Sequence, residues 1–428
     1  MKVLIEGGTI IDPAAGYEGP GDLVIEDGLV LGIVAPGTGP KGADLIDARR
    51  CIVCPGLVDI HTHLREPGHE YKETIASGTR AAAAGGVTSV ACMANTAPIN
   101  DNGSVTEFII RRALEQGVVR VYPIGAVTKE QKGEVLAEMG DMKEAGAVAV
   151  SDDGSVVADS DLMRRGMEYA KTFGLPVITH SEDMSLVGEG VMNEGFVSTE
   201  LGLPASPPEA EEIMIFRDAT LAALTCARLH IAHVTTARGV AIIREAKRRR
   251  VALTGETCPH YFTLTDDAVR TFDTNTKVNP PLRTRSDVDA VIEGLADGTI
   301  DVIASDHAPH VADDKDVEYI FAKSGMIGLE TLLSLSLALV HQKRLAMVEL
   351  IRRLTASPAG IIGIEGGTLA AGSPADVTVF DPDEEWVYDV SETFSKSRNS
   401  PFSGKRMKGR VRLTMVGGRI VYREGKIV

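Results

Sequence analysis

Five apolar, strand-like runs of this sequence end in imidazole or carboxylate side chains, the groups that bind metals and move protons. His61 and His63 end the first of these runs, in VDIHTHLRE. The side chains that end or follow the other four runs are Asp152, Asp153, His180, His233, Asp306 and His307. Residues two apart on a strand point the same way, so His61 and His63 face one spot. Scattered core histidines would not track strand ends, and the pattern therefore indicates one shared site.

The donor atoms of this set are nitrogen and oxygen without thiolate, which suits Zn²⁺ or Mn²⁺. We expect one or two ions, with two favoured, and a carboxylate can bridge such a pair. The other histidines fit less well. His69 and His341 lie in polar stretches, and His230 points away from the neighbours of His233 if the strand is regular. His260, in TCPHYFTLT, either lines the mouth of the site or supports the structure.

Such a site needs strands whose ends meet in space. Apolar β-rich runs alternate with helical runs through the middle of the chain, at residues 53–60, 87–93, 118–124, 147–151, 175–179, 229–234, 251–257 and 300–305. Eight strands with helices between them predict an α/β fold, a TIM-like (β/α)₈ barrel whose active site lies at the carboxyl ends of the strands. A doubly wound open sheet alternates in the same way and is the alternative fold.

The two ends of the chain predict a second, smaller lobe. Short β-like runs fill the first fifty residues, and similar runs return in PADVTVFDP and RVRLTMVGGRIVYREGKIV. We expect both termini to form one small β-sandwich lobe, with residues 1–53 and 366–428 as its two parts. Residues 54–365 would then be the barrel that carries the metal site, a span that fits the ~250 residues of such folds with an insertion or two.

The composition excludes several kinds of partner. The 428 residues carry a formal net charge of −16, which argues against nucleic acid and against an anionic membrane surface. No apolar run is long enough to span a bilayer, and the start, MKVLIEGGTIIDP, lacks a secretory apolar core. Five cysteines, an odd number, favour a reducing compartment. We therefore expect a cytoplasmic protein that binds neither nucleic acid nor a membrane.

Several longer motifs carry a resemblance to a known family. The segments VDIHTHLREPG, SDDGS, THSED, PPEAEE, VNPPLR, SDHAPH and SKSRNSPFSGKRMKG, taken in order, resemble type I dihydroorotases of the amidohydrolase superfamily. The resemblance covers nearly the whole chain. It implies reversible hydrolysis of L-dihydroorotate to N-carbamoyl-L-aspartate, which runs as ring closure in pyrimidine biosynthesis.

The resemblance also implies a role for each site residue. His61, His63 and Asp306 would hold one zinc ion, His180 and His233 would hold a second, and Asp153 would bridge them. Hydantoinases and many other dihydroorotases place a carbamylated lysine at the bridging position, whereas this chain has a carboxylate there. Asp152 would belong to a turn or support the site. The residues implied to bind the substrate are Arg65, Asn95, Asn279, His310, Ser324 and Gly325.

The implied mechanism uses a zinc-bound water, whose pKa falls to ~7, as the attacking hydroxide. Asp306 would take its proton and pass it to the leaving amide nitrogen. The chain departs from the family where Ala94 and Ser324 replace prolines and Ser181 replaces a frequent cysteine. None of these is an implied metal ligand, but Ala94 and Ser324 could loosen the loops that hold substrate.

Two alternatives stay open at the level of sequence. One is another cyclic amidohydrolase, such as an allantoinase or hydantoinase, although Arg65, Asn95 and His310 favour a substrate with a carboxylate. The other is a catalytically silent subunit that scaffolds aspartate carbamoyltransferase. Such subunits typically lose metal ligands, whereas every ligand position is filled here. We expect a homodimer, which could also form a complex with that transferase.

Overall fold

A parallel barrel forms the centre of the molecule in the computed structural model, which describes residues 2–428. Its strands are β6 (Leu57–Thr62), β7 (Val87–Cys92), β8 (Arg120–Gly125), β9 (Ala149–Ser151), β10 (Val177–Thr179), β13 (Leu229–Ile231), β14 (Leu253–Thr257) and β15 (Val302–Ile303). Each strand pairs in parallel with the next one in this order. A parallel bridge between Thr62 and His307 closes the ring beside β15. The barrel prediction is confirmed, and the open-sheet alternative is wrong.

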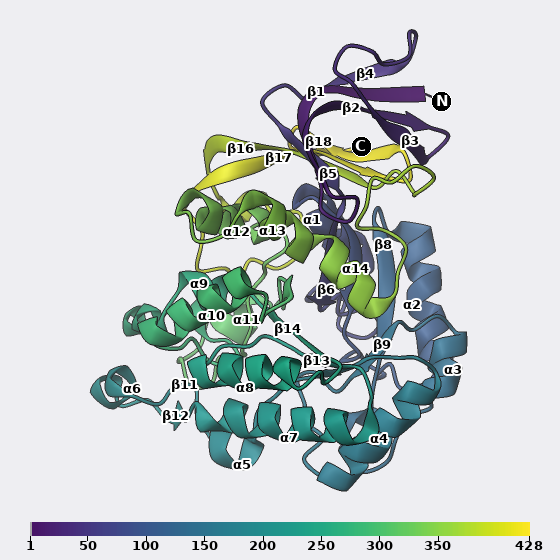
Figure 1. Ribbon diagram of the computed structural model, residues 1–428. Coiled ribbons are helices and arrows are strands. Elements are labelled where there is room, and N and C mark those ends of the chain that lie inside the picture. Colours follow the sequence, from purple (N-terminus) through teal and green to yellow (C-terminus); the bar gives the residue numbers. More distant parts are fainter. Residues whose placement is uncertain (1) are drawn as a thin grey trace.

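Helices cover the outside of the barrel (Figure 1). The principal ones are α1 (Ile75–Ala84), α2 (Gly103–Gln116), α4 (Ser160–Thr172), α7 (Glu209–Thr225), α8 (Ala237–Arg248), α10 (Arg285–Asp297), α12 (Leu332–His341), α13 (Met347–Leu354) and α14 (Ala356–Ile362). Strands β6 and β7 are buried along their whole length, because side chains fill the interior and helices cover the exterior. This explains why neither strand has an exposed face.

Both termini build one β-rich lobe at the end of the barrel, as the sequence predicts (Figure 1). The N-terminal strands are β1 (Lys2–Asp12), β2 (Tyr17–Glu26), β3 (Leu29–Val34), β4 (Asp44–Asp47) and β5 (Ile52–Pro55). The C-terminal strands are β16 (Val377–Val387), β17 (Arg406–Val416), β18 (Arg419–Arg423) and β19 (Lys426–Ile427). Antiparallel pairing of β16 with β5 joins the two groups, and their apolar side chains share one core.

The sequence predicted one strand over residues 53–60, but the structure has parts of two strands there. Strand β5 ends at Pro55 and belongs to the terminal lobe, while β6 begins at Leu57 and opens the barrel. Gly56 lies between them, where a Cβ atom would overlap the side chain of Thr88. The proline and the glycine therefore mark the passage from the lobe into the barrel.

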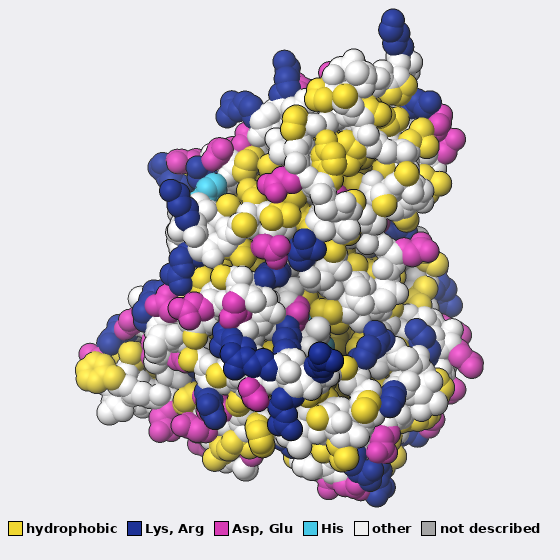
Figure 2. All heavy atoms as spheres, in the orientation of Figure 1, with side chains coloured by type: hydrophobic (Ala, Val, Ile, Leu, Met, Phe, Trp, Pro, Cys, Tyr) yellow, Lys and Arg dark blue, Asp and Glu magenta, His cyan; other side chains and the backbone are white. Residues whose placement is uncertain are grey.

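The basic run 247–250 lies at the end of a helix. Helix α8 ends at Arg248 with Lys247 and Arg248 in its last turn, where cations are favourable. Figure 2 shows Lys and Arg side chains gathered on the face where α8 lies. Among residues 2–428, no helix has the length and apolar character needed to cross a membrane.

The connection between β16 and β17 reaches back from the lobe to the barrel. Its residues 393–400, here called the β16–β17 loop, are held at one end by Glu330. The Glu330 carboxylate accepts hydrogen bonds from the Thr393 hydroxyl and from the main-chain N–H groups of Phe394 (2.7 Å) and Ser395 (3.4 Å). This contact predicts a pH effect that can be measured.

Replacing Glu330 with glutamine is expected to change the pH dependence of stability. Burial raises the pKa of Glu330 from about 4.5 to about 7. The folded state therefore binds the proton more tightly, and this stabilisation is present below about pH 4.5 and is lost as pH rises through about 7. An amide does not ionise, so the Tm of Glu330→Gln, measured relative to that of the wild type, should rise between about pH 5 and pH 8. A constant Tm difference across that range would contradict the pKa assignment.

Candidate metal centre

The six predicted metal ligands converge at the carboxyl end of the barrel, and all six are buried. His61 lies on β6 and His63 directly follows it, while the other four sit just past the ends of β9, β10, β13 and β15. A metal ion could be held by His61, His63 and Asp306, or by His61, Asp153 and His233, whose donor atoms lie within 4.8 Å of one another. Parallel strands bring these side chains together because their carboxyl ends meet at one rim.

The Asp153 carboxylate occupies the middle of the cluster. Its Oδ1 lies 3.5 Å from His61 Nε2, 3.5 Å from His180 Nδ1 and 3.4 Å from His233 Nε2. Its Oδ2 lies 3.5 Å from His63 Nε2. One carboxylate therefore faces four imidazoles, three at Oδ1 and one at Oδ2. Asp152 points elsewhere and accepts hydrogen bonds from the main-chain N–H groups of Val127 (2.7 Å) and Thr128 (3.1 Å).

Two atoms at the centre show that the cluster fits a cation. Across the described chain, His61 Nε2 and Asp153 Oδ1 are buried and have no hydrogen-bond partner. Buried polar atoms are normally satisfied, because leaving one without a partner is unfavourable. Here both atoms point at a common space ringed by nitrogen and oxygen donors, which are the ligands of zinc and similar ions. The residues present therefore fit a metal ion.

Three of the four imidazoles are each oriented by a separate hydrogen-bond acceptor. His61 Nδ1 donates to Glu256 Oε1 (2.5 Å), His63 Nδ1 donates to Asn95 Oδ1 (2.9 Å), and His180 Nε2 donates to Glu182 Oε2 (2.8 Å). In each ring the remaining nitrogen lies 3.5 Å from an oxygen of Asp153, and His180 Nδ1 also lies 2.8 Å from His233 Nε2. Metal-binding histidines commonly have such partners, which fix the tautomer and the ring orientation.

Glu256 and Glu182 were missed in the sequence, although signals for both exist. Glu256 lies near the end of the run 251–257, which was not among the five runs predicted to contribute to the site. It also accepts from His230 Nε2 (3.2 Å), which gives that histidine a place beneath the centre. Glu182 stands two residues after His180 in THSED. A search for carboxylates at every strand end would have found Glu256.

Electrostatics favours positive charge at the centre. Burial disfavours the charged form of His61, but Asp153, Glu256 and Asp306 outweigh it and raise the pKa of His61 well above its usual value. Burial likewise opposes ionisation of Asp153, yet the surrounding histidines hold its pKa well below the usual range. The pKa of Asp306 is also lowered against the effect of burial, mainly by His61 and His63. The cluster thus keeps its carboxylates ionised in a buried place, as a cation site requires.

The backbone at the site is strained in places. Asp306 has φ +46°, His233 has φ +34° and Arg65 has φ +63°, all in the left-handed region that non-glycine residues rarely adopt. Such conformations cluster at functional sites, where the surrounding structure must hold them.

The residues predicted to bind the substrate make hydrogen bonds with neighbouring loops and with one another. Arg65 Nε donates to the Pro309 carbonyl oxygen (3.3 Å), and His310 Nε2 donates to the Ser324 carbonyl oxygen (2.9 Å). The Ser324 hydroxyl donates to Asn279 Oδ1 (3.2 Å), a bond that the family's usual proline could not form. Burial lowers the pKa of Arg65 to about 10, so this side chain stays cationic at neutral pH.

Two of the residues predicted to bind the substrate, Asn95 and Gly325, make other contacts in the structure. The Asn95 amide oxygen is used by His63, as described above, and the main-chain N–H of Gly325 donates to the Lys277 carbonyl oxygen (2.8 Å). The Gly325 carbonyl oxygen accepts from Asn399 Nδ2 (3.1 Å). Asn399, in the β16–β17 loop, also accepts from the main-chain N–H of His310 (3.0 Å). The motif around it, SKSRNSPF, predicted no particular role for this asparagine.

Comparison with known proteins agrees with this arrangement. The dihydro-orotase-like family model matches residues 50–238, and the amidohydrolase family model matches residues 338–422. The dihydroorotases of Geobacter metallireducens and Pelobacter propionicus are each 56% identical over 423 residues, covering 99% of this chain and 100% of each relative. The dihydroorotase of Syntrophus aciditrophicus is 54% identical over 425 residues, with the same coverage.

Solved structures share the fold. The L-hydantoinase (dihydropyrimidinase) from Arthrobacter aurescens superimposes with a TM-score of 0.90 at 25% identity, covering 100% of this chain and 97% of that one. The dihydropyrimidinase from Brevibacillus agri gives a TM-score of 0.87 at 24% identity, covering 100% and 96%. The second similarity concerns the fold alone, because sequence identity is so low.

Proposed function

Since this chain belongs to the dihydroorotase family, we propose that it performs its reaction at a zinc centre bridged by a carboxylate. The enzyme is a cyclic amidohydrolase that interconverts L-dihydroorotate and N-carbamoyl-L-aspartate. The observation that carries the proposal is the position of Asp153, whose two oxygens face His61, His63, His180 and His233. The segment AVAVSDDGSV around it has no lysine that could be carbamylated. These features favour the type I, Asp-bridged subclass over a hydantoinase.

The proposed zinc ligands divide into two groups. His61, His63 and Asp306 would hold one ion, His180 and His233 would hold a second, and Asp153 would lie between them. When bound, zinc would supply an activated water molecule and polarise the ring carbonyl. The roles of Glu256, Asn95 and Glu182 are to keep three of the imidazoles in the tautomer that can bind a metal.

Asp306 is the proposed proton carrier. Its Oδ1 lies 3.2 Å from His63 Nε2 and 3.5 Å from His61 Nε2, so the carboxylate sits at the reaction centre. Its lowered pKa keeps it ionised and able to accept the proton of the attacking water. It would then deliver that proton to the ring nitrogen as the amide bond breaks. In the reverse direction the same carboxylate would remove the proton from the carbamoyl nitrogen.

Arg65 and the residues around it would orient the substrate. A guanidinium binds a carboxylate through paired hydrogen bonds, which suits the carboxylate of dihydroorotate. We propose that Arg65, Asn95 and His310 bind this group, and that Asn279 and the main chain at Ser324 and Gly325 contact the ring. Allantoin and simple hydantoins lack the carboxylate and would leave Arg65 without its partner.

The proposal is tested by removing and restoring the metal. Chelation should abolish hydrolysis of L-dihydroorotate, and zinc should restore it, because no protein side chain replaces the activated water. Allantoin and 5-methylhydantoin, assayed beside it with the same enzyme, should react far more slowly. Full activity in the chelated enzyme would contradict the metal mechanism. A preference for a ureide without a carboxylate would contradict the substrate assignment.

We further propose that the chain forms a cytoplasmic homodimer that can associate with aspartate carbamoyltransferase. Apolar side chains on the outer face of α7, namely Ile213, Phe216 and Leu224, are more than half or about half exposed and would suit a protein contact. A silent scaffolding role is disfavoured because all six ligand positions are occupied by residues that bind metals.

A further inference from the structure

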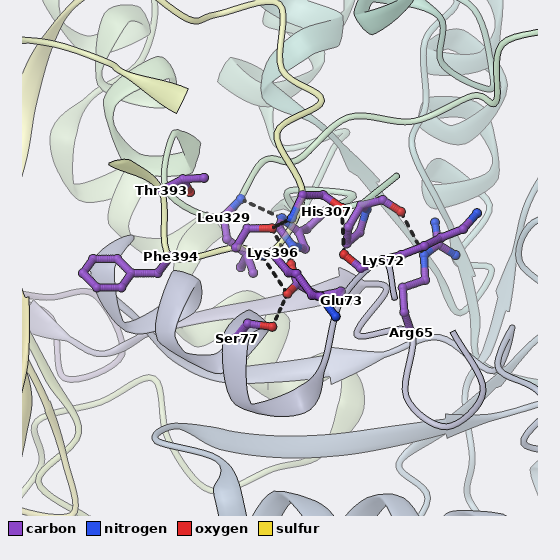
Figure 3. Close-up of polar contacts among 12 residues, drawn as sticks. Arg65, Lys72, Glu73, Ser77, His307, Leu329, Thr393, Phe394 and Lys396 are labelled. Atoms are coloured by element: carbon purple, nitrogen blue, oxygen red, sulfur yellow. Dashed lines mark hydrogen bonds and ion pairs between the residues drawn. The ribbon is translucent and has the colours of Figure 1, made fainter. Parts of the chain in front are cut away.

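Glu73 is a buried carboxylate that joins three distant parts of the chain just outside the metal centre. It lies two residues before the first residue of α1 and is 0% exposed. Its Oε2 accepts from His307 Nε2 (3.3 Å) and from the Ser395 hydroxyl, and its Oε1 accepts from the main-chain N–H of Lys396 (3.0 Å) and from the Ser77 hydroxyl. Figure 3 shows Glu73 between the start of α1, His307 and the β16–β17 loop.

These donors explain how the buried charge is tolerated. Burial opposes ionisation, but the bonds from His307, Ser395 and Ser77 outweigh it and hold the pKa of Glu73 below its usual value. A buried carboxylate with this many donors makes strong, oriented hydrogen bonds. Glu73 therefore holds the groups that donate hydrogen bonds to it in fixed positions.

His307 connects Glu73 with the main chain at the wall of the barrel. Its Nε2–H is donated to Glu73, and its Nδ1 accepts from the main-chain N–H groups of Gly328 (3.2 Å) and Leu329 (3.5 Å). Its carbonyl oxygen accepts from the main-chain N–H of His63 (2.9 Å). Both ring nitrogens and the backbone are thus engaged, so the position of residue 307 is set by its neighbours.

Asp306 lies between two such anchors. On one side the main-chain N–H of Ser305 donates to both oxygens of Asp59 (3.2 Å each), and on the other stands His307. Between them Asp306 adopts φ +46°, a conformation that is uncommon for a non-glycine residue and persists only where its surroundings hold it. Release of either anchor would let the backbone relax and move the Asp306 carboxylate.

We propose that Glu73 and His307 are positioning residues that hold Asp306 in its strained conformation, and that the β16–β17 loop completes this support. The terminal lobe thereby contributes to the proton transfer. This inference rests on the proposed role of Asp306 as proton carrier. It assigns a purpose to three sequence features otherwise without one: the glutamate of YKET, the first histidine of DHAPH and the serine-lysine pair of SKSRN.

Two substitutions of His307 separate its two hydrogen bonds. A glutamine amide nitrogen can reach the place of Nε2 and donate to Glu73, whereas an asparagine oxygen replaces Nδ1 and removes the donor that residue 307 gives to Glu73. We expect His307→Asn and Glu73→Gln to lower kcat about 10- to 100-fold, the usual effect of losing a group that orients an active-site residue. We expect His307→Gln to retain most of the activity. In all three variants KM and the bound metal should stay close to the wild-type values.

Glu330→Gln is the matched control, because it alters a carboxylate that holds the same loop but does not touch His307. It should change Tm and leave kcat unchanged. The proposal is overturned if His307→Asn keeps full kcat, if Glu73→Gln and Glu330→Gln lower kcat equally, or if the lost activity follows lost metal. Asp306→Asn, assayed in parallel, separates a failure of the positioning proposal from a failure of the proposed role of Asp306 as proton carrier. If that variant stays active, the proton-carrier role itself fails.

Discussion

Asp306→Asn should lower kcat about 10²- to 10⁴-fold, the range that general acid–base groups contribute, in both hydrolysis and ring closure. The amide keeps the shape of the side chain but cannot accept the proton of the attacking water or return one to the ring nitrogen. Since the same carboxylate serves both directions, both rates should fall by the same factor. The rates are to be measured at saturating zinc, because His61 and His63 also lose a charged neighbour.

The folded state of this variant needs its own check. Metal content and Tm should stay near the wild-type values, since the amide oxygen can still face the centre and the backbone anchors on both sides are unchanged. Asp313→Asn is a suitable control, because this carboxylate is exposed on the short helix α11 (Ala312–Lys315), seven residues further on. Near-wild-type turnover of Asp306→Asn would remove this residue from the mechanism.

Asp153→Ala should lose at least one metal ion per chain, and with it nearly all activity. The reason is geometric, because this one carboxylate faces all four imidazoles at 3.4–3.5 Å. Without it the two proposed ion positions have no shared ligand, and the histidines lose the negative charge that balances them. Metal content per chain, together with kcat after zinc addition, measures both effects.

The neighbouring residue provides a matched comparison. Asp152→Asn should keep the metal and most of the activity but lose stability, by about 1–3 kcal/mol if one main-chain donor is left without its acceptor. Its carboxylate accepts from Val127 N, Thr128 N and the Thr128 hydroxyl, which connects β9 to the residues after β8. If Asp153→Ala retained both ions and full activity, the Asp-bridged subclass would be wrong.

The sequence predicted the architecture because the barrel strands are apolar and regularly separated. It also predicted that histidines and aspartates at strand ends would meet, which follows from the parallel arrangement alone. The division of run 53–60 into β5 and β6 was not foreseen, because both parts are apolar and only Pro55–Gly56 marks the break. Local patterns report burial, and they do not report which sheet a strand joins.

The supporting contacts were harder to foresee than the ligands. Glu256 reaches His61 from a strand almost two hundred residues further along the chain. Asn399 connects His310 with Gly325 through a loop that belongs to the terminal lobe. Asn95 was expected to bind substrate, and its contact with His63 depends on how two neighbouring strand ends are aligned. Each of these pairings depends on tertiary register, which no local spacing in the sequence expresses.

The late position of the β16–β17 loop in the chain also sets an order of events during synthesis on the ribosome. A nascent chain that has reached α14 already contains every barrel strand and all six proposed ligands. It still lacks Ser395, Lys396 and Asn399, and β5 has not yet met its partner β16. N-terminal parts of a chain begin to fold while later parts are still being made. The barrel can therefore close before the β16–β17 loop, which we propose supports Asp306, has been made.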